Sequence, residues 1–279
     1  MSFGSHYKFV KRILVALDAS PQSLAALRVA TDLAARLDAE LIGIFIEDIN
    51  LVQLARLPFT RQISIATGTL LQMDSSLVER ELRSQARWAL NNMALLADKL
   101  KFKWSFRVVR GAISPQLQAA AAEADITILG KTGWSGRRLL GSTAQNLVNK
   151  APCTSLILQN PIHFGAPVIV LYDGTQTGKR ALESVDLIIS PETQLIVVLL
   201  AGDAEEARQF RREVDTFFSR QGLQPQYHWF RHINSAVLTD LVKTELCGVL
   251  VLPTKSERIP KKIILDTLNQ SECAVLLVN

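Results

Sequence analysis

The stretch GKTGWSGRRLLGS, residues 130–142, decides the fold, because it stands between two segments of different character. Before it, residues 125–129 (DITIL) are mostly aliphatic and β-branched, as in a buried strand. After it, residues 143–150 (TAQNLVNK) have helical character. The chain therefore predicts a strand, a glycine-rich loop and a helix in direct succession.

The same alternation of strands and helices runs through the first half of the chain. Strands are expected at residues 12–17, 40–46, 104–110, 125–129 and 154–158, and helices at 21–37, about 75–100, 114–122 and 143–150. Ser20 and Pro21 supply a cap and a first-turn proline for the first helix, and residues 74–76 cap the second. This order predicts an α/β fold with a doubly wound, parallel, five-stranded sheet.

The connection over residues 47–73 is long and mixed, and it contains Pro58 and Gly68. A connection of this length is unusual in a compact α/β domain, so we expect a flexible or functional loop. Its apolar residues are suited to lining an apolar pocket or to covering a partner. They are Leu51, Leu54, Leu57, Pro58 and Phe59.

The chain contains an internal repeat. After a stretch with prolines and a glycine, residues 160–167, an aliphatic run ends at Asp173 as the first run ends at Asp18. Further on, residues 126–129 match 249–252, and residues 151–158 match 271–278. The repeat predicts two tandem domains, one at residues 1–160 and one at residues 161–279, each with a five-stranded sheet.

Composition narrows the class of protein. The longest apolar runs are far shorter than the roughly 18 residues that a bilayer requires, and residues 1–10 lack the pattern of a signal peptide, so we expect a cytoplasmic protein without membrane contact. The net charge of +5 is dispersed, which favours small anionic ligands over nucleic acid. The three cysteines have no disulfide or zinc spacing, and no common catalytic motif is present, so neither a metal site nor an enzyme is expected.

The loop between the fourth strand and its helix has the composition of an anion site. It does not fit the Walker A pattern, since Asp125 stands where the first glycine would be. It carries four glycines and three basic residues: Gly130, Gly133, Gly136, Gly141, Lys131, Arg137 and Arg138. Glycines let the backbone approach a ligand, and the N–H groups of a helix N-terminus favour anions. The alternative is a tight connection with solvated basic side chains.

With these features the sequence resembles the universal stress proteins, in the tandem form that has two such domains in one chain. In that family an aspartate ends the first strand, a G-x2-G-x9-G-[ST] motif follows the fourth, and a pair such as Pro-Cys precedes the last. Asp18, residues 130–142 and Pro152-Cys153 occupy these positions, and the resemblance covers nearly everything from Lys11 onward. It implies the nucleotide-binding α-hydrolase-like fold, with the two halves packed as an internal pseudo-dimer through their fifth strands.

The resemblance also implies an ATP site, with or without magnesium, in the N-terminal domain. Adenine and ribose would be surrounded by Ala16, Leu17, Asp18 and Ile46, and the ribose and phosphates by Gly130, Thr132, Gly133, Gly141, Ser142 and Thr143. Asp18 is the best candidate for a specific contact, because a carboxylate at the end of a strand can accept from ribose hydroxyls or the adenine amino group. The alternative is a plain helix-capping aspartate.

Two departures from the family pattern bear on this implication. Seven residues separate Gly133 from Gly141 where the pattern has nine, so the contacts need not match those of a typical binder, and loss of binding is the alternative. In the second repeat Pro253 and the pair Lys261-Lys262 replace motif glycines. Proline removes an N–H donor and lysine fills space, so we expect the C-terminal domain to be a packing partner that does not bind ATP in this mode.

Two classes of function follow. The first is a cytoplasmic stress-response regulatory protein, in which ATP in the N-terminal domain orders the loop and changes the surface presented to a protein partner. The second is a nucleotide-independent interaction or small-ligand module that uses residues 48–73. A weak ATPase stands third, with slow hydrolysis as a side reaction that needs no dedicated base. Further pairing of two chains into a homodimer is left open by the sequence.

Overall fold

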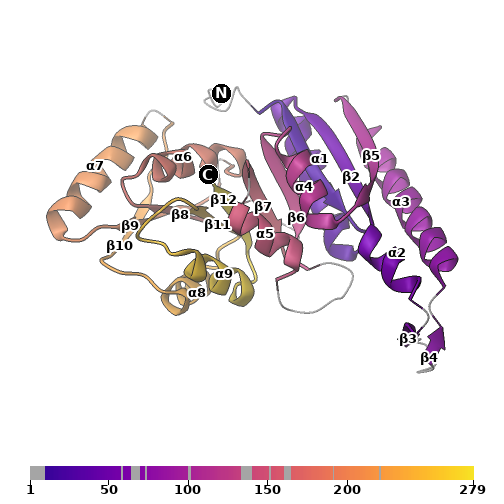
Figure 1. Ribbon diagram of the computed structural model, residues 1–279. Coiled ribbons are helices and arrows are strands. Elements are labelled where there is room, and N and C mark those ends of the chain that lie inside the picture. The colour runs from indigo at the N-terminus through magenta and orange to yellow at the C-terminus, as the bar shows by residue number, and fades with distance from the viewer. Residues whose placement is uncertain are drawn as a thin grey trace.

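A computed structural model describes residues 10–57, 59–63, 70–72, 74–99, 102–132, 140–150, 152–159, 165–190, 192–219 and 221–279 (Figure 1). Its main feature is a single ten-stranded sheet, in the order β10-β9-β8-β11-β12-β7-β6-β1-β2-β5. The N-terminal half of the chain, indigo to magenta in Figure 1, forms one end of this sheet, and the C-terminal half, orange to yellow, forms the other.

The N-terminal half contributes five parallel strands. They are β1 (Arg12–Leu17), β2 (Glu40–Asp48), β5 (Trp104–Gly111), β6 (Ile126–Gly130) and β7 (Thr154–Leu158). β1 pairs with β2 on one side and with β6 on the other, all in parallel. The chain thus winds in opposite directions from β1, and a crevice forms at the carboxyl ends of β1 and β6, where ligands of such sheets bind.

Helices cover both faces of this half of the sheet. They are α1 (Pro21–Leu37), α3 (Ser75–Ala97), α4 (Ile113–Ala121) and α5 (Ser142–Lys150). Leu27 of α1 and Met93 of α3 belong to one hydrophobic core, and Leu117 of α4 and Val148 of α5 to the other, so the two pairs of helices lie on opposite faces. The predicted elements are confirmed, with ends within three residues of those expected.

The segment 47–73, expected to be a flexible or functional loop, contains regular structure, and its functional role stays a prediction. The segment contains α2 (Ile49–Ala55) and an antiparallel hairpin of β3 (Arg61–Ile63) and β4 (Leu70–Gln72). The Asp48 carboxylate accepts from the Asn50 backbone N–H at 3.0 Å and caps α2, which packs on α3. A helix of seven residues with two buried positions is too short to show a helical periodicity of apolar residues in the sequence. The hairpin projects beyond α2 and α3 (Figure 1).

The C-terminal half repeats this arrangement, which confirms the internal repeat. Its strands are β8 (Val168–Tyr172), β9 (Leu195–Leu200), β10 (Gln226–Phe230), β11 (Val249–Pro253) and β12 (Ala274–Val278). Its helices are α6 (Gln176–Ser184), the short 3-10 helix η1 (Val185–Leu187), α7 (Ala204–Ser219), α8 (Ser235–Thr244) and α9 (Lys261–Gln270).

Across the described ranges of both halves, no helix is long and apolar enough to cross a membrane. The predicted domain boundary falls at residues 160 and 161, outside the described residues.

The two halves meet through their fifth strands. β12 pairs with β7 in antiparallel register, with Leu276 opposite Leu156, and α5 packs on α9 beside them. We call this junction the seam. An antiparallel pair of equivalent strands relates the halves as two subunits of a dimer are related, so the predicted internal pseudo-dimer is confirmed.

Candidate functional site

A cavity of about 840 Å³ opens in the N-terminal half, at the carboxyl ends of β1, β2 and β6. It lies at the crevice that the winding of the sheet creates. The predicted site residues that line it are Ala16, Leu17, Asp18, Ile46, Gly130, Thr132, Gly141 and Thr143. Ser142, the first residue of α5, stands between Gly141 and Thr143 in the chain. Gly133 lies outside the described residues. The fold thus brings four distant segments together, and their contacts with a ligand remain a prediction.

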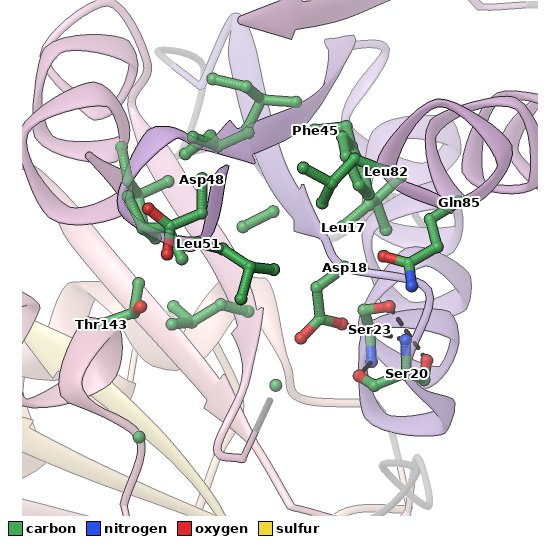
Figure 2. A pocket seen from close by; sticks show the side chains of 18 of the residues that line it. Leu17, Asp18, Ser20, Ser23, Phe45, Asp48, Leu51, Leu82, Gln85 and Thr143 are labelled. Atoms are coloured by element: carbon green, nitrogen blue, oxygen red, sulfur yellow. Dashed lines mark hydrogen bonds between the residues drawn. The ribbon is translucent and has the colours of Figure 1, made fainter. Parts of the chain in front are cut away.

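Asp18 holds the turn that follows β1. Its Oδ1 atom accepts from the Ser20 backbone N–H at 3.0 Å, and Ser20 in turn caps α1 by accepting from the Ser23 N–H at 3.1 Å. The alternative interpretation of Asp18 as the helix cap is therefore wrong, since Ser20 is the cap. Figure 2 shows Asp18 extending from β1 into the same space that Leu51 and Thr143 face. One carboxylate oxygen is engaged in the turn, and within the described part of the chain the other accepts no hydrogen bond, so it can accept from a ligand.

Several helices begin at the cavity. Ser20, Asp48 and Asp74, the caps of α1, α2 and α3, all line it. The N–H groups of a helix N-terminus attract anions, but the carboxylates of Asp48 and Asp74 already occupy two of these termini. The hydrogen bond from the Ser76 backbone lowers the pKa of the Asp74 carboxyl, which keeps it charged. The first turn of α5 carries no acidic residue, so its N–H groups are the best position in the cavity wall for a phosphate.

Lys131 lines the cavity, but its ammonium has protein partners of its own, so its expected role in charging the cavity stays a prediction. The residue is 3% exposed, and its ammonium donates to Gln159 Oε1 at 2.6 Å and, across the seam, to the carbonyl oxygens of Asn269 at 3.1 Å and Ser271 at 3.2 Å. Burial lowers the pKa of this ammonium. These partners could not be predicted from the sequence, because two of them lie about 140 residues away. The other two predicted cations, Arg137 and Arg138, lie outside the described residues.

Gly130 has a structural role that the sequence did not show. A Cβ atom at this position would lie 2.8 Å from the Cβ of Gln22 on α1, closer than side-chain atoms approach. The end of β6 therefore packs directly against the start of α1. This contact, as well as any ligand, requires glycine at the first position of the motif.

One wall of the cavity comes from α3 and was not predicted. Leu77, Glu81 and Gln85 stand four residues apart and so share a helix face, and Arg80 and Leu82 lie beside them. Arg80 is a cation placed to meet an anionic ligand. The spacing is visible in the sequence, but it does not say which part of the sheet the helix covers. Within the described ranges, no group of three or more His, Cys, Asp or Glu side chains could hold a metal ion.

The corresponding place in the C-terminal half is spanned by an ion pair. Arg258, in the loop after β11, donates to Glu206 Oε2 at 3.0 Å and Oε1 at 2.7 Å, and also to the carbonyl oxygen of Leu200 at the end of β9. β8 lies between β9 and β11, so this bridge crosses the carboxyl end of β8, where Asp173 is 4% exposed. Side chains of the protein itself thus cross the place that the N-terminal half leaves as a cavity.

The fold and the cavity define a class: doubly wound α/β proteins with a ligand site where the direction of winding reverses. The model of the universal stress protein family matches residues 10–159, more than half of the chain, and the chain belongs to that family. Universal stress protein MJ0531 of Methanocaldococcus jannaschii is 26% identical over 155 residues, which are 54% of this chain and 83% of that protein.

Two solved structures share the fold over almost the whole chain. A universal stress protein of Archaeoglobus fulgidus DSM 4304 has a TM-score of 0.73 at 14% identity, with 97% of each chain covered. Protein PA1789 of Pseudomonas aeruginosa PAO1 has a TM-score of 0.57 at 14% identity, with 97% of this chain and 92% of that chain covered. At this level of identity, the likeness concerns the fold alone.

Proposed function

We propose that the protein binds an adenine nucleotide, ATP with or without magnesium, in the cavity of the N-terminal half, and that occupancy of this cavity acts as a switch read by a protein partner. The observation that carries the proposal is the arrangement of Asp18 and the start of α5. Both face one cavity at the reversal of the sheet, one as an acceptor and the other as a set of N–H donors (Figure 2).

The cavity has the size and the chemistry that this ligand needs. Its volume of about 840 Å³ is within the usual range for small-molecule sites. Leu51, Leu77 and Leu117 line it and offer apolar contact to an adenine ring. The second carboxylate oxygen of Asp18 can accept from ribose hydroxyls, while the N–H groups of α5 and the guanidinium of Arg80 suit the phosphates.

A binding role fits the cavity better than a catalytic one. The titratable side chains that the structure describes along its walls are carboxylates, Arg80 and Lys131, and the ammonium of Lys131 is already bonded at the seam. Thr132 and Gly141 line the cavity and flank the rest of the glycine loop. A nucleotide that contacts both can therefore change the surface offered to a partner. Slow hydrolysis would be incidental to this role.

The test is to denature freshly purified protein, identify any released small molecule by chromatography and mass, and titrate the emptied protein with Mg-ATP in a calorimeter. We expect adenine nucleotide at a molar ratio near one, or saturable heat with one site for each chain. Absence of both released nucleotide and binding heat would show that the proposal is wrong.

A second candidate is nucleotide-independent binding through α2 and the residues after it. Leu54, Leu57 and Phe59 are 46%, 56% and 92% exposed, an unusual density of open apolar side chains, and Leu51 of the same helix lines the cavity. The same extraction separates the two candidates. An apolar small molecule in the extract, with no response to Mg-ATP, would favour this second function.

A further inference from the structure

We propose that Asn269, in the C-terminal half, is a positioning residue for the ligand site of the N-terminal half. The inference rests on the proposed function, because it concerns the cavity where the nucleotide would bind. If the inference is right, the C-terminal half takes a direct part in the ligand site of the N-terminal half. The equivalent place in the C-terminal half itself is crossed by the ion pair of Arg258 and Glu206.

Asn269 contacts both ends of the glycine loop. Its side-chain Oδ1 accepts from the Leu140 backbone N–H at 2.9 Å, and its backbone carbonyl accepts from the Lys131 ammonium at 3.1 Å. Asn269 lies in the last turn of α9, where helix carbonyls lack intrahelical partners and are available to an outside donor. One residue of the C-terminal half therefore holds the point where the loop leaves β6 and the point where it returns to α5.

The two ends of the loop are also joined to each other. The Gly141 N–H donates to the Lys131 carbonyl at 3.0 Å, and the side chain of Gln145 in α5 donates to the Leu140 carbonyl at 3.0 Å. Leu140 is 3% exposed, so its N–H has no ready replacement acceptor in water. The polar groups around the loop ends form a connected set, to which the C-terminal half contributes Asn269 and the Ser271 carbonyl; of these two residues, Asn269 is the one that contacts both ends.

The held residues lie next to those that face the cavity. Gly141 and Thr143 line the cavity immediately after Leu140, and Thr132 does so immediately after Lys131. The N–H groups of α5 must be held within a few tenths of an ångström to meet a phosphate well. Without the bond to Asn269, the start of α5 would be held to β6 by fewer hydrogen bonds, of which Gly141 to Lys131 remains, and the site would bind its ligand less tightly.

The coupling must act in both directions. If Asn269 favours the binding-competent arrangement of the loop ends, a bound nucleotide must favour the bonds to Asn269 by the same factor. A ligand in the N-terminal half should therefore slow amide exchange at the end of α9, in the C-terminal half. A residue that only packed at the seam would not respond in this way.

The experiment compares Asn269→Ala with Asn269→Asp, which keeps an acceptor for the Leu140 N–H. Gln270→Ala is the matched control, because Gln270 is in the same helical turn and its side chain accepts from Thr239 of α8 rather than from the loop. Mg-ATP affinity is measured by calorimetry. Hydrogen exchange of residues 140–145 and 265–271 is measured with and without Mg-ATP.

We expect Asn269→Ala to weaken Mg-ATP binding by roughly three- to tenfold, the loss of one hydrogen bond, and to speed exchange of residues 140–145 in the nucleotide-free protein. Asn269→Asp and Gln270→Ala should stay near wild type in both measurements. Wild-type exchange or wild-type affinity in Asn269→Ala would overturn the inference. A wild-type protein that binds no Mg-ATP would instead overturn the proposed function, and exchange of residues 140–145 would then decide whether Asn269 positions the loop.

Discussion

Asp18 and Asp173 make the same turn in the two halves of the protein. The Oδ1 atom of each accepts from the backbone N–H two residues further on, at 3.0 Å from Ser20 and at 3.1 Å from Thr175. Their surroundings differ, because Asp18 lines the cavity, whereas Asp173 is 4% exposed and within electrostatic reach of Arg258. The two halves therefore provide an internal comparison of one turn with and without an open site.

The first prediction uses this comparison. Asp18→Ala should weaken Mg-ATP binding by about tenfold or more, because it removes a charged acceptor from the cavity. Asp173→Ala removes the same turn contact in the C-terminal half and should leave Mg-ATP affinity unchanged. Calorimetric titration of both variants checks the prediction, with thermal unfolding to show that each is folded. Equal affinities for Asp18→Ala and the wild type would argue against the site.

The second prediction concerns the residue after each aspartate. Ala19 and Gly174 both have positive φ angles, 60° and 77°, a conformation that costs an alanine about 1 kcal/mol or more. Ala19→Gly should therefore raise the free energy of unfolding by about 0.5–1 kcal/mol.

Gly174→Ala is the reverse change in the other half and should lower the free energy of unfolding by about 2–3 kcal/mol. It would introduce the same strain, and its Cβ would lie 2.5 Å from the Phe210 ring. Urea denaturation measures both variants. Effects of the same sign for the two substitutions would contradict this account of the turn.

The third prediction concerns Lys131 at the seam. Lys131→Met keeps the length and apolar stem of the side chain but leaves three acceptors at the seam without their donor. We expect a loss of about 2 kcal/mol in the free energy of unfolding, since buried unpaired acceptors are costly. Lys243→Met, at an exposed position in α8, is the control and should change stability little. A loss no larger than that of the control would mean that the ammonium contributes no net stability.

The fourth prediction concerns pH. Hydrogen bonds from Arg258 lower the pKa of the Glu206 carboxyl in the folded protein. The unfolded chain therefore binds the proton more readily, so the stability due to this pair is present at neutral pH and is lost as the pH falls through the folded pKa.

Glu206→Gln should consequently destabilise the protein by about 0.5–1 kcal/mol near pH 7, because the pair is partly exposed and screened by solvent, and the difference from wild type should shrink as the pH falls below about 5. Urea denaturation at several pH values checks this. Glu205→Gln is the control, an exposed position in the same helical turn. A difference that stayed constant over this range would show that the charge of Glu206 is not what stabilises the pair.

Much of the fold could be predicted because its signals are local. The aliphatic runs of β1, β6, β7 and β8 end within one residue of their expected positions, and Ser20 and Asp74 cap their helices as expected. Strand periodicity and caps depend on residues only a few positions apart, so a sequence displays them directly. The elements that could not be predicted in this way are α2 and the β3–β4 hairpin, which are too short to show a helical or strand periodicity in the sequence.

The sequence by itself determined the alternation of strands and helices, the repeat and the segments that would meet at a strand end, since these follow from side chains close together in the chain. The tertiary structure alone decided which way the Lys131 ammonium points, which face of α3 lines the cavity and that Arg258 spans the C-terminal half. These depend on partners outside the local sequence, such as Glu206 for Arg258 and Asn269 for Lys131, which lie 52 and 138 residues away. Such pairings follow from how the whole chain packs, because burial leaves a charged group only the partners that the fold brings to it.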